Sequence, residues 1–228
     1  MTIRSRLLLL ATAGPGLAAA APAAAHPHVW ITTKAEIVYG ADGRVTGLRH
    51  AWTFDPSYSA LTVQGLERGG DGAPSPQALA VLARENIESL GESRYFTALK
   101  VAGRPVEVGA PEAPAMGYAD GALTLSFTLP LKAPAGPGAL SLEVFDPTYF
   151  VAFSLAEGDG VATLSGAPAG CRATVHRPRP QAADAKSGDK PAGRAGTGSG
   201  MSEAFFEALT AASTYGVQFA NRIVVACS

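Results

Sequence analysis

Two neighbouring segments that alternate apolar and polar side chains constrain the fold more than any other feature of the chain. The segments are Val29–Tyr39 and Arg44–Phe54, and Gly40-Ala41-Asp42-Gly43 between them is typical of a tight turn. Alternate residues of a strand share one face. In the second segment, one face therefore holds Leu48, His50, Trp52 and Phe54. The pattern predicts a β-hairpin with one buried face.

After this hairpin the spacing of apolar residues changes to that of helices. Pro56–Leu66 fits a short helix, and Ser75–Leu90 fits a longer one that begins at a good N-cap residue. Pro76 suits the first helical position, and Gly91 suits the end of the helix. We therefore expect a helix–loop–helix insertion over residues 56–91.

Most of the remaining chain has the character of short strands. The expected strands are Tyr95–Ala102, Val106–Gly109, Leu123–Leu131, Ala139–Phe145, Phe150–Leu155 and Cys171–His176. Residues 177–200 are rich in Ala, Gly, Pro and charge, which predicts a disordered linker or a long loop. Ser202–Tyr215 has a helical apolar stripe, and Ile223–Cys227 is apolar. The fold class expected is α+β: a β-rich antiparallel domain over 26–176, completed by a C-terminal helix and strand within 201–228.

Residues 1–25 have the features of a secretory signal peptide. Arg4 and Arg6 precede an apolar stretch, and Ala23-Ala24-Ala25 offers small residues for cleavage. A membrane anchor is the alternative, but Gly and Pro interrupt a stretch that is shorter than the roughly 20 residues a span needs. We expect cleavage after Ala25 and a periplasmic protein that does not itself span the membrane.

Charge and cysteine content exclude several classes of protein. The 228-residue chain has a formal net charge of −1, which argues against a nucleic-acid partner. Its two cysteines are too few for a zinc ribbon or an iron–sulfur site. In an oxidising compartment Cys171 and Cys227 form a disulfide most simply, with a thiolate pair on a metal as the alternative. No serine-hydrolase, P-loop, dinucleotide-binding or zinc-protease motif is present, and we do not expect an enzyme.

The expected mature N-terminus brings three nitrogen ligands together. Cleavage leaves His26 with an α-amine and an imidazole, and His28 adds a second imidazole two residues on. Nitrogen ligands suit Ni, Co, Zn or Cu. Pro27 has no amide proton, which rules out the square-planar amino-terminal motif that needs a deprotonated amide there. A chelate by amine and imidazole remains, and the alternative is that both histidines lie loose in solvent.

Three other residues are lower-ranking metal ligands. His50 lies on the apolar face of its strand, where a core histidine with one hydrogen-bond partner is the alternative. Asp55 and Asp146 belong to a motif that occurs twice, Phe54-Asp55-Pro56-Ser57-Tyr58 and Phe145-Asp146-Pro147-Thr148-Tyr149. Asp before Pro is typical of a cap or turn at the end of a strand. The functional alternative is that both carboxylates line one pocket and complete a metal shell.

The loop from Glu67 to Ala78 has the outline of a calcium-binding EF-hand loop. Gly69 stands at its third position and Ala78 at its twelfth, where oxygen ligands are needed. We therefore expect a helix connector whose calcium binding is weak or absent.

Several of these motifs occur together and in an order that resembles one family. They are His26-Pro27-His28-Val29-Trp30-Ile31, Trp52-Thr53-Phe54-Asp55, the helix–loop–helix, Tyr95-Phe96 and Phe145-Asp146-Pro147-Thr148-Tyr149. The set resembles a bacterial periplasmic family, domain of unknown function 1007, described as a periplasmic component of a transport system and often encoded beside nickel/cobalt permeases.

The resemblance implies an exported partner of metal transport. The hypothesis is a periplasmic accessory protein that binds a divalent transition metal and acts with an inner-membrane metal permease for nickel/cobalt or zinc. The alternative is a non-metal structural or interaction module that docks on a membrane transport complex.

Overall fold

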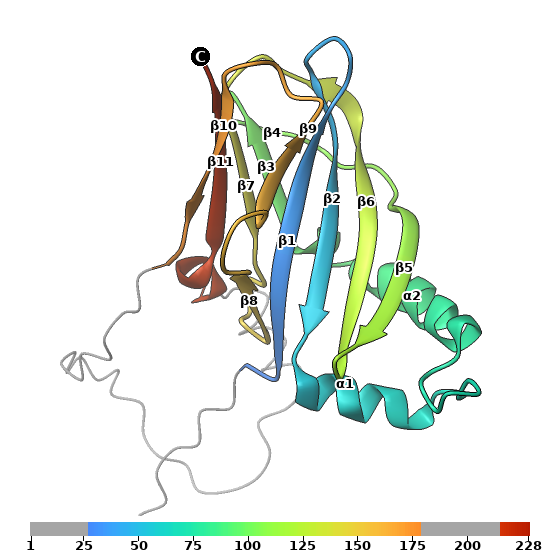
Figure 1. Ribbon diagram of the computed structural model, residues 1–228. Coiled ribbons are helices and arrows are strands. Elements are labelled where there is room, and N and C mark those ends of the chain that lie inside the picture. Colours follow the sequence, from blue (N-terminus) through green and yellow to red (C-terminus); the bar gives the residue numbers. More distant parts are fainter. Residues whose placement is uncertain (1–26, 179–214) are drawn as a thin grey trace, which may run out of the picture.

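The predicted hairpin is present and forms the centre of a six-stranded sheet. The computed structural model describes residues 27–178 and 215–228 (Figure 1). Strand β1 (Val29–Tyr39) pairs antiparallel with β2 (Val45–Phe54), so that Ile31 lies opposite Phe54. Gly43 in the turn has a φ of 74°, a value that favours glycine. The expected apolar face of β2 is buried at all four positions.

The first sheet has the strand order β5-β6-β2-β1-β8, and β9 also pairs with β1. The added strands are β5 (Glu112–Ala119), β6 (Ala122–Ala135), β8 (Val151–Leu155) and β9 (Ala162–Ser165). Both β8 and β9 run parallel to β1, so the expectation of a purely antiparallel domain is wrong here. The reason is that the chain crosses from the second sheet before β8 and enters the edge of the first sheet in the direction of β1.

The second sheet faces the first across the core and is antiparallel throughout (Figure 1). Its strand order is β10-β11-β7-β3-β4. The strands are β10 (Cys171–His176), β11 (Asn221–Cys227), β7 (Leu140–Val144), β3 (Thr97–Val101) and β4 (Arg104–Pro105). Asn221 ties the layers together because its side-chain amide donates to the carbonyl of Phe153 in the first sheet, at 2.8 Å.

Two helices follow β2, as the sequence predicts. Helix α1 (Pro56–Thr62) continues as a 3-10 turn at Val63–Gly65, and α2 (Pro76–Leu90) packs against β5. Ser75 is the N-cap of α2, and its hydroxyl accepts from the Ala78 N–H at 3.1 Å. Further 3-10 turns are Arg94–Phe96 and Tyr215–Phe219. Within the described ranges, no helix has both the length and the apolar character that a membrane crossing requires.

Some predicted elements differ from the structure. Val106–Gly109 is not a strand and keeps only one bridge, between Val108 and Leu131, whereas β5 and β9 were not predicted. The described C-terminal residues form a 3-10 turn and a strand, so the C-terminal helix expected there is not found in them. The expected helix residues 202–214 lie outside the described residues, as do the signal peptide 1–25 and residues 179–200 of the linker.

The predicted disulfide between Cys171 and Cys227 is confirmed. The two cysteines lie opposite each other in β10 and β11, and their sulfur atoms are 2.05 Å apart. They are the two cysteines of the chain. The bond joins residues that are 56 positions apart in the sequence. The covalent link holds the last strand in the second sheet.

Removing this disulfide should lower the free energy of unfolding by about 4 kcal/mol, because the unfolded chain then regains the entropy of an open loop of this length. Urea unfolding of the Cys171→Ala/Cys227→Ala variant checks this against the oxidised protein. Reduced wild-type protein is the matched control and should unfold at the same urea concentration as the variant. Equal stability of all three forms would contradict the prediction.

Candidate functional site

The start of β1 lies between the two copies of the Phe-Asp-Pro motif. On one side, the Trp30 N–H donates to Oδ2 of Asp55 at 3.2 Å, and the Asp55 N–H donates to the Trp30 carbonyl at 2.9 Å. On the other side, the His28 N–H donates to the carbonyl of Phe150 at 2.9 Å. Strand β8 then continues beside β1 from Val151. Asp55 of the first motif and Phe150, directly after the second motif, therefore hold residues 28–30 from both sides.

Asp55 holds the beginning of α1. Its Oδ1 accepts from the N–H groups of Ser57 at 3.0 Å and Tyr58 at 2.9 Å, which are unpaired donors of the first helical turn. Its Oδ2 accepts from Trp30, so both carboxylate oxygens already bind backbone donors. In the structure Asp55 has the capping role that the Asp-Pro pair suggests.

Asp146 holds the crossing between the sheets and is only 6 % exposed. Its Oδ1 accepts from the N–H and the hydroxyl of Thr148, at 2.9 and 2.8 Å, and its Oδ2 accepts from the Val151 N–H at 3.0 Å. Three donors compensate for burial of the charge. Gly216 closes this turn, since a Cβ there would overlap the Asp146 carbonyl. Asp146 therefore sets the entry into β8.

His28 is exposed and held in place by its neighbours. Its ring stacks on Phe150, with centroids 4.6 Å apart and an interplanar angle of 24°. Trp30 follows on the same side of the strand and is 53 % exposed. The preceding ligand, His26, lies outside the described residues. Of the predicted ligands, the structure thus brings His28 close to the Asp55 and Asp146 turns.

His50 is in the core, 2 % exposed, between the two sheets. Its Nε2 lies 3.4 Å from the hydroxyl oxygen of Thr97, and that hydroxyl donates to the Tyr95 carbonyl at 2.7 Å. Because the Thr97 proton is used in this way, we assign the Nε2–H tautomer, with Nε2 as the donor to Thr97. Burial lowers the pKa of His50 from 6.5 to about 4, so the ring is neutral. His50 is therefore a core histidine with one hydrogen-bond partner, which was the alternative to a metal ligand.

The described residues hold no cluster of three or more His, Cys, Asp or Glu side chains able to bind a metal ion. In the loop that resembles an EF-hand, the side chain of Arg68 binds backbone carbonyl groups. The guanidinium of Arg68 donates to the carbonyls of Gly72 at 2.9 Å and Val63 at 3.3 Å. These bonds join the loop to the end of the preceding helix.

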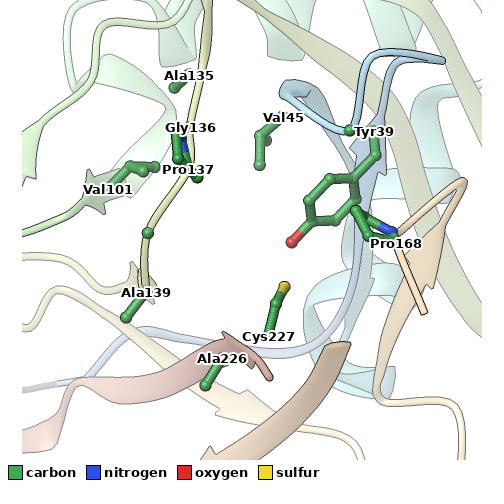
Figure 2. Close-up of a pocket in the computed structure, with 12 residues that line it drawn as sticks. Tyr39, Val45, Val101, Ala135, Gly136, Pro137, Ala139, Pro168, Ala226 and Cys227 are labelled. Atoms are coloured by element: carbon green, nitrogen blue, oxygen red, sulfur yellow. The ribbon is translucent and has the colours of Figure 1, made fainter. Parts of the chain in front are cut away.

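A pocket of about 240 Å³ opens between the sheets at the turn of the first hairpin (Figure 2). Sequence reasoning did not find it. Its walls come from Tyr39, Gly43, Val45, Val101, Ala135, Gly136, Pro137, Gly138, Ala139, Pro168, Ala226 and Cys227. Burial raises the pKa of the Tyr39 hydroxyl, and Figure 2 shows this hydroxyl directed into the space. The lining contains no imidazole and no carboxylate, so it offers a metal none of its usual nitrogen or oxygen side-chain ligands.

The structure is that of an α+β protein made of two facing sheets. Its candidate site lies at the start of β1, where the strand is hydrogen-bonded on both sides. The chain belongs to the family described as Protein of unknown function (DUF1007), whose model matches residues 11–227. A comparison with curated proteins finds no match.

Acid should destabilise the protein through His50. The folded pKa is about 4 and the unfolded pKa about 6.5, so the unfolded chain binds the proton first. The contribution of neutral His50 to the free energy of unfolding is complete above pH 6.5. As the pH falls from 6.5 to 4, the free energy of unfolding should decrease by about 3 kcal/mol. Urea unfolding across this range measures it, and His50→Leu should flatten the profile. His176→Leu, at an exposed position, should leave the slope unchanged; an equal slope in His50→Leu would refute the assignment.

Replacing Asp146 should cost more stability than replacing Asp55, and both losses should occur without added metal. We expect about 3 kcal/mol for Asp146→Ala, because three part-buried donors lose their acceptor, and about 1 kcal/mol for Asp55→Ala, because a cap is lost. Thermal unfolding in the presence of a chelator measures both. Wild-type stability of Asp146→Ala under these conditions would contradict the structural role.

Proposed function

We propose that the protein is a periplasmic accessory protein that binds a divalent transition metal for a nickel/cobalt or zinc uptake system. Its partner is an inner-membrane metal permease. The ligands are the α-amine and imidazole of His26 and the imidazole of His28. The observation that supports this proposal is the position of His28, an exposed imidazole held on Phe150 at the fixed start of β1.

The fixed backbone supports chelation because it lowers the entropy lost on binding. The His28 N–H is bonded to Phe150, and the next residues are paired with β8. Alternate residues of an extended chain face the same way, so positions 26 and 28 suit a common ion. Nitrogen ligands of this kind favour Ni, Co, Cu and Zn over Mg or Ca.

The other predicted ligands, all of which lie in the described part of the chain, are already engaged or buried. Asp55 and Asp146 already accept backbone hydrogen bonds with both oxygens, and His50 is buried in the core. Water or groups of the partner would therefore complete the coordination shell. An open shell of this kind suits delivery of a metal to a second protein, because the recipient's ligands can replace water.

The metal-binding proposal predicts that a free N-terminal His26 is required. The protein is expressed with its natural signal, its mature N-terminus is determined, and Ni, Co, Cu and Zn are titrated by calorimetry. One extra N-terminal Gly, or His28→Ala, should weaken binding by about tenfold or more, because each removes a nitrogen ligand. Affinity should also fall as the pH drops through the imidazole and amine pKa values, about 6.5 and about 7.7–8.0.

His176→Ala is the matched control, since it removes an exposed imidazole from β10 and should leave metal affinity unchanged. If the Gly-extended protein binds as tightly as the mature protein, or if neither binds, the terminal chelate is wrong.

A second candidate is a non-metal module that docks on a membrane transport complex. The exposed Phe150 and Leu61 favour it, because both are large apolar side chains at the surface, and Figure 1 shows α1 near the end of the molecule where β1 begins. Absence of metal binding by the mature protein would leave this candidate as the better one.

A further inference from the structure

Over four adjacent strands, no helix or strand of residues 27–178 and 215–228 covers the outer face of the first sheet. Residues of β1 and β2 that point to the second sheet are buried, whereas those that point outward are exposed or half-buried. The same alternation holds along β6. This face is a separate surface from the core and from the pocket of Figure 2, and it continues from Trp30 along β1.

A row of hydroxyl side chains crosses this face. Its members are partners in register on β8, β1, β2 and β6, in the order Ser154, Thr32, Thr53 and Thr124. The Thr53 and Thr124 hydroxyl oxygens are 2.9 Å apart, and those of Thr32 and Ser154 are 3.5 Å apart. With neighbouring strands about 4.8 Å apart, the row extends over about 14 Å. It presents hydroxyl oxygens in two neighbouring pairs, Thr53 with Thr124 and Thr32 with Ser154.

An exposed indole and a flat strip flank the row. Trp30 lies two residues before Thr32 on the same face of β1, and its ring contacts no aromatic ring of the described residues. On the other side of the row, Ala51 and Ser126 are register partners, with Ala115 beyond them on β5. These side chains are small, so they leave room for a ligand beside the row, and Lys34 lies opposite Ala51 on β1.

The charge on this face favours a neutral ligand. Arg49 is paired with Glu36 at 2.9 Å, and Lys34 is the further cation in the outward positions of β1. A nucleic acid or an acidic polymer needs several clustered cations. An apolar protein partner needs a larger apolar patch than Trp30 and Phe150 form, and the ring of Phe150 is already stacked with His28. Hydroxyl groups beside an aromatic ring instead match a polyhydroxy molecule that has apolar C–H faces.

We propose that this face binds a neutral glycan made of pyranose rings. One sugar ring stacks on the indole of Trp30, and the hydroxyl groups of the following sugars exchange hydrogen bonds with Thr32, Thr53 and Thr124. The proposal is independent of metal binding at the N-terminus, since it uses neither His26 nor His28.

Intrinsic fluorescence offers a direct test, because the chain has two tryptophans and Trp52 is fully buried. The mature protein, in a buffer with a chelator, is titrated with soluble oligosaccharides of glucose and of N-acetylglucosamine. Binding should shift the Trp30 emission to shorter wavelength as the indole leaves water. Because the ligand is neutral, its affinity should be unchanged at high salt.

Calorimetry on variants then locates the site. Trp30→Ala should weaken binding about tenfold or more, Trp30→Phe should retain part of it, and Thr53→Val should weaken it severalfold. Val81→Ala on α2 is the control, since it removes an exposed apolar side chain elsewhere and should have no effect.

Lack of binding by every oligosaccharide overturns the proposal, and so does binding that Trp30→Ala leaves intact. Sedimentation measures whether the protein dimerises instead; a dimer that Trp30→Ala dissociates would assign the face to a second copy and overturn the glycan. None of these outcomes bears on the N-terminal chelate, because metal is absent throughout.

Discussion

Pairing of β1 on both sides is the constraint on which the rest of the structure depends. β2 binds one edge of this strand, and β8 and β9 bind the other, so β1 is the strand through which the hairpin and the later crossing segments become one sheet. At its start the backbone is bonded to Asp55 on one side and to Phe150 on the other. The positions of His28 and Trp30 follow from these bonds.

The repeated Phe-Asp-Pro motif has the same role in two places: its carboxylate accepts hydrogen bonds from backbone N–H groups that follow a strand. At the end of β2 and again after β7, the chain leaves a strand and must satisfy backbone N–H groups that no ladder reaches. Asp55 accepts from the first turn of a helix, and Asp146 accepts from a tight turn and the first residue of β8. A short carboxylate followed by Pro, which lacks an N–H, suits both. The likeness of the motifs therefore reflects local backbone chemistry, and their shared location comes from the pairing of β1.

Local sequence predicts the elements whose signals are local. The hairpin, helix α2 with its Ser75 cap and the burial of His50 follow from period and capping chemistry. Strand β5 contains Pro114 and Gly117, which weaken strand propensity, and it exists because β6 pairs with it. The parallel pairing of β8 with β1 and the hydroxyl row depend on long-range register, which no local pattern contains. The stacking of His28 on Phe150 depends on the same long-range pairing, so no local pattern predicts it.

The proposed metal site and the proposed glycan-binding face both include residues at the start of β1. This shared strand restricts how the two sites can act together. His28 and Trp30 are two residues apart on the same side of the chain, so a metal ion bound by His28 and a sugar stacked on Trp30 would lie close together. Neither site needs the other's ligands, because one uses nitrogen atoms and the other an indole with hydroxyl groups. A glycan held on the sheet face would position the terminal metal site relative to that glycan without a hinge, since β1 is paired along both edges. Any coupling between the sites would then act through Trp30, which lies two residues from His28 on a strand that is hydrogen-bonded along both edges.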